Sequence, residues 1–241
     1  LLARVLGPAD YGVYTYVYAL VSLLSVPSEF GLPVLVVRET ARGMAQRDYA
    51  AVKGIWSWAG KVTTFISITL VGLTALTLWI LKEPLAGKKL VTFAWALALV
   101  PLIALGDLRG AALRGLQRVI AGQLPEFLIR PGLLVIFLAA GALFLGGQLS
   151  SPQAMILYVL ASALAFGAGA WLLWRETPSG VRQAAPRFEN RTWLLSTLPL
   201  AFISGMQLVN NQASILLQGF FLPDAEIGIY RVAAQTSWLA L

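Results

Sequence analysis

The stretch YGVYTYVYALVSLLSVPSEFGLPVLVV, residues 11–37, decides the fold class of this protein. It exceeds the roughly 20 apolar residues that a helix needs to cross a bilayer, and Glu29 is its only charged side chain. Similar apolar spans follow along the chain, and residues 1–6 are predicted to end an earlier helix. The further spans are 57–81, 90–106, 120–146, 153–174, 193–221 and 227–241. The sequence therefore predicts an all-α polytopic membrane protein.

Composition supports this class and excludes several kinds of chemistry. Hydrophobic residues make up 58% of the chain and charged residues 12%, against roughly 45–50% and about 25% in soluble domains. Cys and His are absent, which excludes disulfides and the usual zinc sites. The chain also contains neither a Gly-rich phosphate loop nor a nucleophile elbow. We expect a protein that is not an enzyme and has no resident cofactor, driven by an ion gradient or by a partner. The coupling ion stays open.

Positive charges are distributed unevenly between the connections. The connections after the first, third and fifth spans are rich in arginine, and the others carry few cations. Since cytoplasmic loops of membrane proteins carry an excess of Lys and Arg, this pattern predicts a plasma-membrane protein with its Arg-rich loops in the cytoplasm. A nucleic-acid interface is not expected, because no soluble domain clusters the charges. The three Arg-rich connections are RETARGMAQRDYAAVKG, starting at Arg38, DLRGAALRGLQR, which includes Arg109, and RETPSGVRQAAPRFENR, starting at Arg175.

One motif occurs twice, as LLARVLGPADYGVY at residues 1–14 and LLQGFFLPDAEIGIY at residues 216–230. Six spans separate the copies, so both would face the same side of the membrane, as in a parallel repeat of six helices. The alternative is a chance similarity of two short interfacial turns. We expect a fragment of a two-lobe transporter: an N-terminal lobe at 1–180, an inter-lobe loop at 181–192, and the truncated start of a second lobe at 193–241.

Polar side chains form stripes at helical spacing within three of the spans. Because polar groups facing lipid are costly, the stripes should face a solvated cavity or else bond to neighbouring helices. The cavity is the preferred interpretation, since the stripes cross most of the membrane. The stripes are Thr15, Tyr18, Ser22, Ser25 and Glu29; Gln123, Glu126 and Arg130; and Ser204, Gln207, Asn211, Ser214 and Gln218, with Asn210 beside the last.

Glu126 and Arg130 are one helical turn apart and allow two interpretations. In one, they neutralise each other; in the other, Arg130 offers a cation to an anionic substrate while Glu126 holds its side chain. Pro125 and the Pro131–Gly132 pair are expected to bend this helix, and Pro27 and Pro33, with Gly31 between them, are expected to mark a similar weak point in the first span. The span 153–174 is rich in Ala and Gly and predicts close helix packing without chemistry of its own.

The first motif, with FGLPVLVVRETAR at residues 30–42, resembles the polysaccharide and O-antigen flippases of the multidrug/oligosaccharidyl-lipid/polysaccharide exporter superfamily. Further matches are the RGLQR segment, residues 114–118, and IGIYRVA, residues 227–233. The resemblance covers nearly the whole chain. It implies two six-helix bundles around a central cavity, and alternating access that carries an isoprenoid-diphosphate-linked oligosaccharide from the inner to the outer leaflet.

If the resemblance holds, arginines attract the diphosphate and polar side chains bind the sugar. The candidate site residues are Arg130, Glu126, Gln123, Arg231, Arg38, Glu29, Ser25, Gln207, Asn210, Asn211 and Ser214. Expected partners are a lipid-linked oligosaccharide, membrane lipids, and a polysaccharide polymerase or glycosyltransferases. A multidrug or small-solute exporter of the same superfamily and a non-transporting scaffold for polysaccharide assembly are the alternatives. For Arg38, a role as a cytoplasmic anchor is equally open.

Overall fold

The computed structural model describes residues 2–81, 87–144, 149–203 and 206, and these residues form helices and no strand. Residues 190–203 are helical as well and follow α9 in the chain. The named helices are α1 (Leu2–Glu29), α2 (Leu32–Ala45), α3 (Tyr49–Leu81), α4 (Lys88–Ala96), α5 (Leu99–Gly115), α6 (Val119–Leu124), the π-helical turn η1 (Pro125–Ile129), α7 (Arg130–Phe144), α8 (Ser151–Glu176) and α9 (Ser179–Gln183).

The helices confirm the predicted all-α polytopic class. Within the described residues, four helices are long and apolar enough to cross a membrane, and a fifth span results if α1 and α2 count as one bent pair. These five correspond to the first five predicted spans. The predicted spans 193–221 and 227–241 lie largely outside the described residues, and the division into two lobes remains a prediction.

One predicted boundary was wrong in a way that matters for the site. The third span was predicted to end at residue 106, with Arg109 in a loop, but α5 continues to Gly115. Arg109 therefore lies inside a helix, with 6% of its surface exposed. The helix continues because residues 108–113 are mainly small or apolar and pack in the core, and because Arg109 finds acceptors on two neighbouring helices.

Two hydrophobic clusters hold the helices together at the two ends of the molecule. One cluster joins α1, α4, α7 and α8 through side chains such as Tyr14, Phe93 and Met155. The other joins α2, α3 and α5 through Leu35, Ile55 and others. Large apolar side chains outside the clusters stay exposed, especially along α3, as expected for surfaces that contact lipid.

The first membrane span is broken between α1 and α2, which meet at an angle of 44°. Phe30 and Gly31 have φ values of 47° and 68°, in the left-handed region where glycine is favoured. Pro27 and Pro33 flank the break, so the weak point expected from the prolines is present. The helix at residues 190–203 packs against this break, because a Cβ on Gly31 would come within 2.5 Å of the backbone nitrogen of Ala201.

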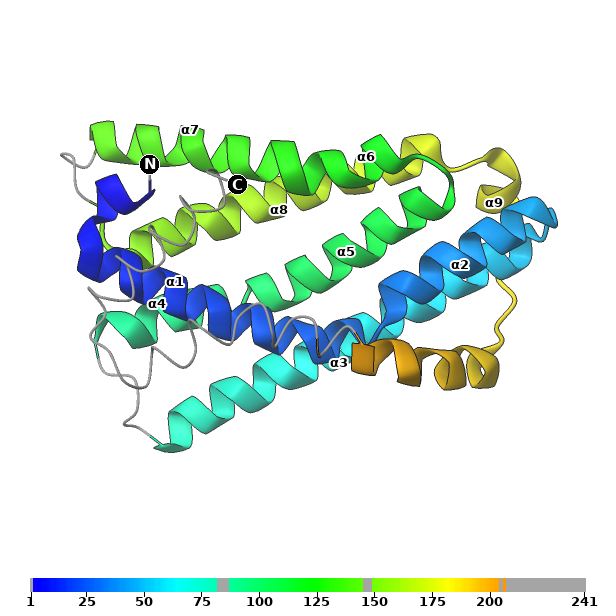
Figure 1. Cartoon of the computed structure of the whole chain (residues 1–241), viewed down its shortest axis with the longest axis horizontal. Helices are drawn as coiled ribbons and strands as arrows, with labels where there is room; N and C mark the ends of the chain where they lie inside the picture. Colours follow the sequence, from blue (N-terminus) through cyan, green and yellow to red (C-terminus); the bar gives the residue numbers. More distant parts are fainter. Residues whose placement is uncertain (1, 82–86, 145–148, 204–205, 207–241) are drawn as a thin grey trace.

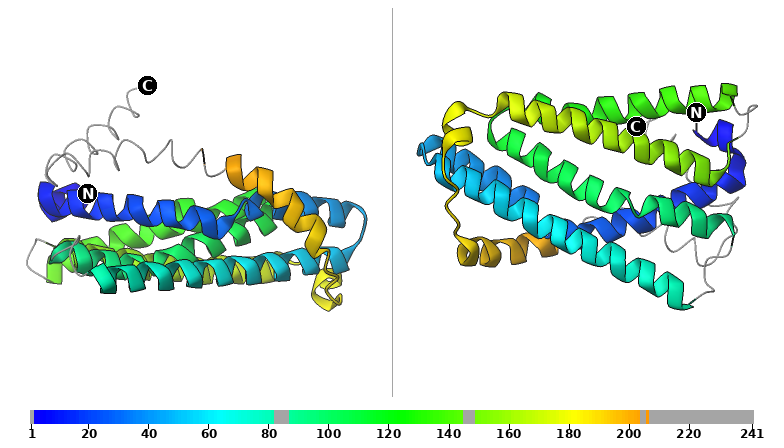
Figure 2. Two further views of the ribbon diagram at one scale, coloured as in Figure 1. Left: turned by 90° about the horizontal axis from the view of Figure 1, so that it is seen from below. Right: turned by 180° about the vertical axis from the view of Figure 1, so that it is seen from behind.

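The three Arg-rich connections lie together at one end of the helices, which we call the Arg-rich end (Figure 1). It contains the α2–α3 turn, the α5–α6 turn and the segment from α8 through α9 to residue 190. Both views in Figure 2 show the same grouping. The arrangement agrees with the alternation of charge along the sequence.

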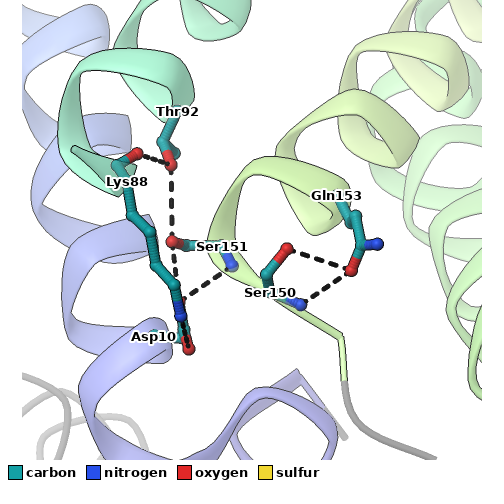
Figure 3. A network of polar contacts seen from close by, with 6 residues as sticks. All are labelled: Asp10, Lys88, Thr92, Ser150, Ser151 and Gln153. Atoms are coloured by element: carbon teal, nitrogen blue, oxygen red, sulfur yellow. Dashed lines mark hydrogen bonds and ion pairs between the residues drawn. The ribbon is translucent and has the colours of Figure 1, made fainter. Parts of the chain in front are cut away.

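A polar network joins α1, α4 and α8 at the opposite end (Figure 3). Asp10 accepts hydrogen bonds from the backbone N–H of Ser151, at 3.0 Å, and from its hydroxyl, at 2.9 Å. The ammonium of Lys88 lies 3.3 Å from the other oxygen of Asp10. Asp10 thus binds the positive N-terminus of α8, which gives the first motif a structural role that its sequence alone did not reveal.

A polar cavity between three membrane helices

A cavity of about 590 Å³ lies between α1, α5 and the α6–η1–α7 segment. Its lining includes most of the first polar stripe and all of the second, so two of the three predicted stripes face one space. The polar and charged lining residues are Tyr18, Ser22, Ser25, Glu29, Asp107, Arg114, Gln123, Glu126 and Arg130. The third stripe begins at Ser204 and lies outside the described residues.

Serine side chains on α1 form the wall nearest the first hydrophobic cluster. Ser25 donates to the carbonyl of Ser22 at 2.8 Å, within its own helix. The hydroxyl of Ser22 is buried and has no hydrogen-bond partner among the described residues. Thr15, predicted for the same stripe, is instead satisfied by the carbonyls of Tyr11 and Gly12 and does not line the cavity. Ser22 therefore lines the cavity with its hydroxyl oxygen buried, whereas Thr15 has a purely structural role.

Two acidic residues on the lining lie in direct contact. The carboxyl groups of Glu29 on α1 and Asp107 on α5 are close enough to interact. Sequence reasoning named Glu29 and missed Asp107, because Asp107 was assigned to an inner loop. No group of three or more His, Cys, Asp or Glu in the described part of the chain could hold a metal ion.

The opposite wall carries a π-helical turn, η1, at the point where the sequence predicted a bend. Pro125 lacks an N–H group, which removes one bond from the ordinary ladder. The backbone N–H of Arg130 bonds to the carbonyl of Pro125, five residues earlier. The helix therefore continues through Pro125 as a single span of residues 119–143. Such turns occur frequently at functional sites, and here the turn includes Glu126.

Glu126 lies between two arginines from different helices. One carboxylate oxygen is 3.2 Å from Nη2 of Arg109 on α5. The other is 2.8 Å from Nη1 of Arg130, one turn along its own segment. The sequence left open whether Arg130 pairs with Glu126 or faces the cavity, and both descriptions hold: the residues are paired and both line the cavity.

Arg109 is anchored from the far side by α8. Its Nη1 donates to the carbonyl of Phe166 at 2.9 Å and to that of Ala165 at 3.4 Å. A Cβ on Gly169 would come within 2.5 Å of Nε of Arg109, and closer still to its guanidinium carbon. The small residues of α8 were predicted to serve packing alone. Gly169 does more, because its missing side chain leaves the space that Arg109 fills.

Arg114, in the last turn of α5, is a further lining cation that sequence reasoning did not single out. Among the described residues it makes no ion pair. It lies where α5 crosses α6 closely: a Cβ on Gly110 would approach the carbonyl of Gly122 to 3.0 Å. Its position one residue before the α5–α6 turn places it at the mouth nearest the Arg-rich end.

The other predicted site residues divide into three groups. Arg38 bonds to Glu39 at 3.0 Å and does not line the cavity, so it remains a candidate for a membrane-surface anchor. Gln123 and Ser25 line the cavity as predicted. The remaining candidates lie outside the described residues: Gln207, Asn210, Asn211, Ser214 and Arg231.

The predicted inter-lobe loop is fixed to the α2–α3 turn. The backbone N–H of Arg187 bonds to the carbonyl of Ala50, and its guanidinium lies 2.6 Å from a carboxylate oxygen of Asp48. Hydrogen bonds to Asp48 and Glu189 raise the pKa of Arg187. Trp193, immediately after the loop, is 2% exposed and packs with Trp58. The loop therefore holds the helix at 190–203 against α2 and α3.

The bundle of apolar helices around a charged cavity defines a multi-pass membrane protein with a polar binding space. A family model described as polysaccharide biosynthesis protein matches residues 1–241, and the chain belongs to this family. Comparisons with curated proteins and with solved structures gave no match. Family membership confirms the resemblance found in the sequence and gives the protein a role in polysaccharide biosynthesis.

Proposed function

We propose that the protein is a flippase that moves an isoprenoid-diphosphate-linked oligosaccharide across the plasma membrane by alternating access. The observation that carries the proposal is a cavity at membrane depth, lined by arginines and hydroxyl and amide groups, in a polysaccharide biosynthesis protein. Charged and polar groups within a membrane usually mark a substrate pathway. Arginine suits a diphosphate because its planar guanidinium can donate two parallel hydrogen bonds.

The proposal assigns a sequence of contacts to the cavity. Arg114 is near the mouth at the Arg-rich end, which we place in the cytoplasm by the distribution of charge. It would meet the diphosphate first, and Arg130, on the α6–η1–α7 segment and further from the α5–α6 turn, would meet it next. Gln123 and Ser25 would bind sugar hydroxyls. The second lobe, from residue 193 onward, would supply the facing wall, with Arg231 and the stripe from Gln207 to Ser214.

The experiment is a translocation assay on the full-length protein in proteoliposomes. A labelled lipid-linked oligosaccharide in the inner leaflet should become accessible from outside, and Arg114→Gln should slow this at least tenfold. Arg42→Gln is a matched control, because it removes an exposed arginine at the same end that does not line the cavity. Normal translocation by the Arg114 variant would contradict the assignment. A small-solute exporter would instead move drugs and ignore the glycolipid, and a scaffold would move neither.

A further inference from the structure

We propose that Arg130 is an anion-binding site that Glu126 masks in the absence of substrate, with Arg109 retaining Glu126 when the site is occupied. The inference rests on the proposed function, because it assumes that the cavity receives an anion. It deepens that function by naming the residue that the phosphate must displace. The ligand class is an organic diphosphate or phosphate ester.

The geometry divides the two oxygens of Glu126 between two partners. Arg109 takes one oxygen at 3.2 Å and Arg130 takes the other at 2.8 Å. One negative charge therefore faces two positive charges. Arg109 has few other options, because its side chain is 5% exposed and its other bonds go to backbone carbonyls of α8. Arg130 is 21% exposed and lines the cavity, so it is the partner that can exchange Glu126 for a ligand.

The surroundings of Arg130 leave room for an anion. The cavity that it lines has a volume of about 590 Å³, and the amide of Gln123, another lining residue, can donate a hydrogen bond to a ligand oxygen. Asp107 is the other acidic group that faces Arg130, and it interacts with Glu29.

The charge balance of the cavity supports the same conclusion. Arg109 and Arg130 contribute two positive charges to the ion-pair cluster, and Glu126 contributes one negative charge. These three residues together have a net charge of +1, which an entering phosphate group would compensate. If Glu126 served only to neutralise Arg130, it would not also need to pair with Arg109.

The test uses Glu126→Gln in the full-length protein, with farnesyl diphosphate as the probe and farnesol as the control. The amide keeps one carbonyl oxygen for Arg109 and turns an NH₂ group toward Arg130, so the mask is removed while Arg109 keeps an acceptor. We expect farnesyl diphosphate to bind Glu126→Gln at least tenfold more tightly than the wild type. Farnesol should bind both proteins equally. Equal or weaker diphosphate binding by a folded variant would overturn the proposal.

A second variant keeps the test decisive if Glu126→Gln does not fold. Arg130→Gln leaves Glu126 paired with Arg109, so it should fold, and it should bind farnesyl diphosphate at least tenfold more weakly than the wild type. Unchanged binding would overturn the masked site. Translocation of the lipid-linked oligosaccharide is measured separately. If the wild type does not translocate it but Glu126→Gln still binds the diphosphate more tightly, the masked site stands and the proposed function fails.

Discussion

Replacing Gly169 with alanine should disturb the cavity from a helix that does not line it. A Cβ at this position would meet Nε, Nη1 and Cζ of Arg109 at distances that no pair of atoms tolerates. The guanidinium must then move from the carbonyls of Ala165 and Phe166 and from Glu126. Breaking a buried ion pair costs about 3–5 kcal/mol. Alanine returns about 1 kcal/mol through its better helix propensity, so the net destabilisation should be about 2–4 kcal/mol.

Gly167 provides the matched control, two residues away on the same helix. A Cβ there meets nothing within 4 Å, so Gly167→Ala should keep or slightly raise the melting temperature. Thermal unfolding of the full-length protein in detergent measures both variants. The cause is isolated by repeating Gly169→Ala in an Arg109→Leu background, where the added methyl group should cost much less than in the wild type. If Gly169→Ala melts like Gly167→Ala, the role of Arg109 described here is wrong.

Four other predictions concern separate parts of the structure. Asp10→Ala should lower the melting temperature, because it removes the acceptor at the N-terminus of α8 and reduces the free energy of unfolding by about 1–2 kcal/mol. Glu189→Ala, at an exposed site, should leave the melting temperature unchanged. Gly31→Ala should impair both stability and translocation, because its φ is 68° and the new Cβ would clash with Ala201. Gly72→Ala, with open space around the new Cβ, should change neither stability nor translocation. Asp107→Asn should raise the melting temperature, because an amide can donate a hydrogen bond to the neighbouring carboxylate of Glu29, and a lower value would contradict the contact between the two side chains. In a cysteine-free full-length protein, Arg47→Cys should react with an impermeant thiol reagent added on the cytoplasmic side, and Gly87→Cys should react with the reagent added on the outer side. The opposite labelling pattern would contradict the proposed orientation.

The sequence predicted the membrane class and much of the cavity because both depend on helical periodicity. Spacings of three and four residues placed Ser22, Ser25 and Glu29 on one face, and placed Gln123, Glu126 and Arg130 on another. These local rules hold whatever the neighbouring helices are. They also predicted the weak point between α1 and α2, where Pro27, Gly31 and Pro33 interrupt the apolar run.

Periodicity did not reveal which residues the neighbouring helices contribute. Arg109 and Asp107 were assigned to a loop because a charge normally ends an apolar span. Their place inside α5 depends on partners far away in the sequence, namely Glu126, Glu29 and the carbonyls of α8. Asp10 was missed for the same reason, since its partner Ser151 lies 141 residues further along the chain. Only the folded arrangement shows that these charges are compensated.

Glycines mark the site more directly than the charged residues do. A Cβ on Gly106 would lie 2.9 Å from a carboxylate oxygen of Glu126, and one on Gly169 would overlap Arg109. The ion pair between Glu126 and Arg109 is thus enclosed by glycines from two different helices, α5 and α8. In a membrane, small residues usually allow helix backbones to approach each other. Here they make room for charged side chains instead, because the low-dielectric surroundings make an unpaired charge costly. Glycines within a span that also contains a charge therefore predict a buried ion pair, which is a more useful signal than either residue type alone.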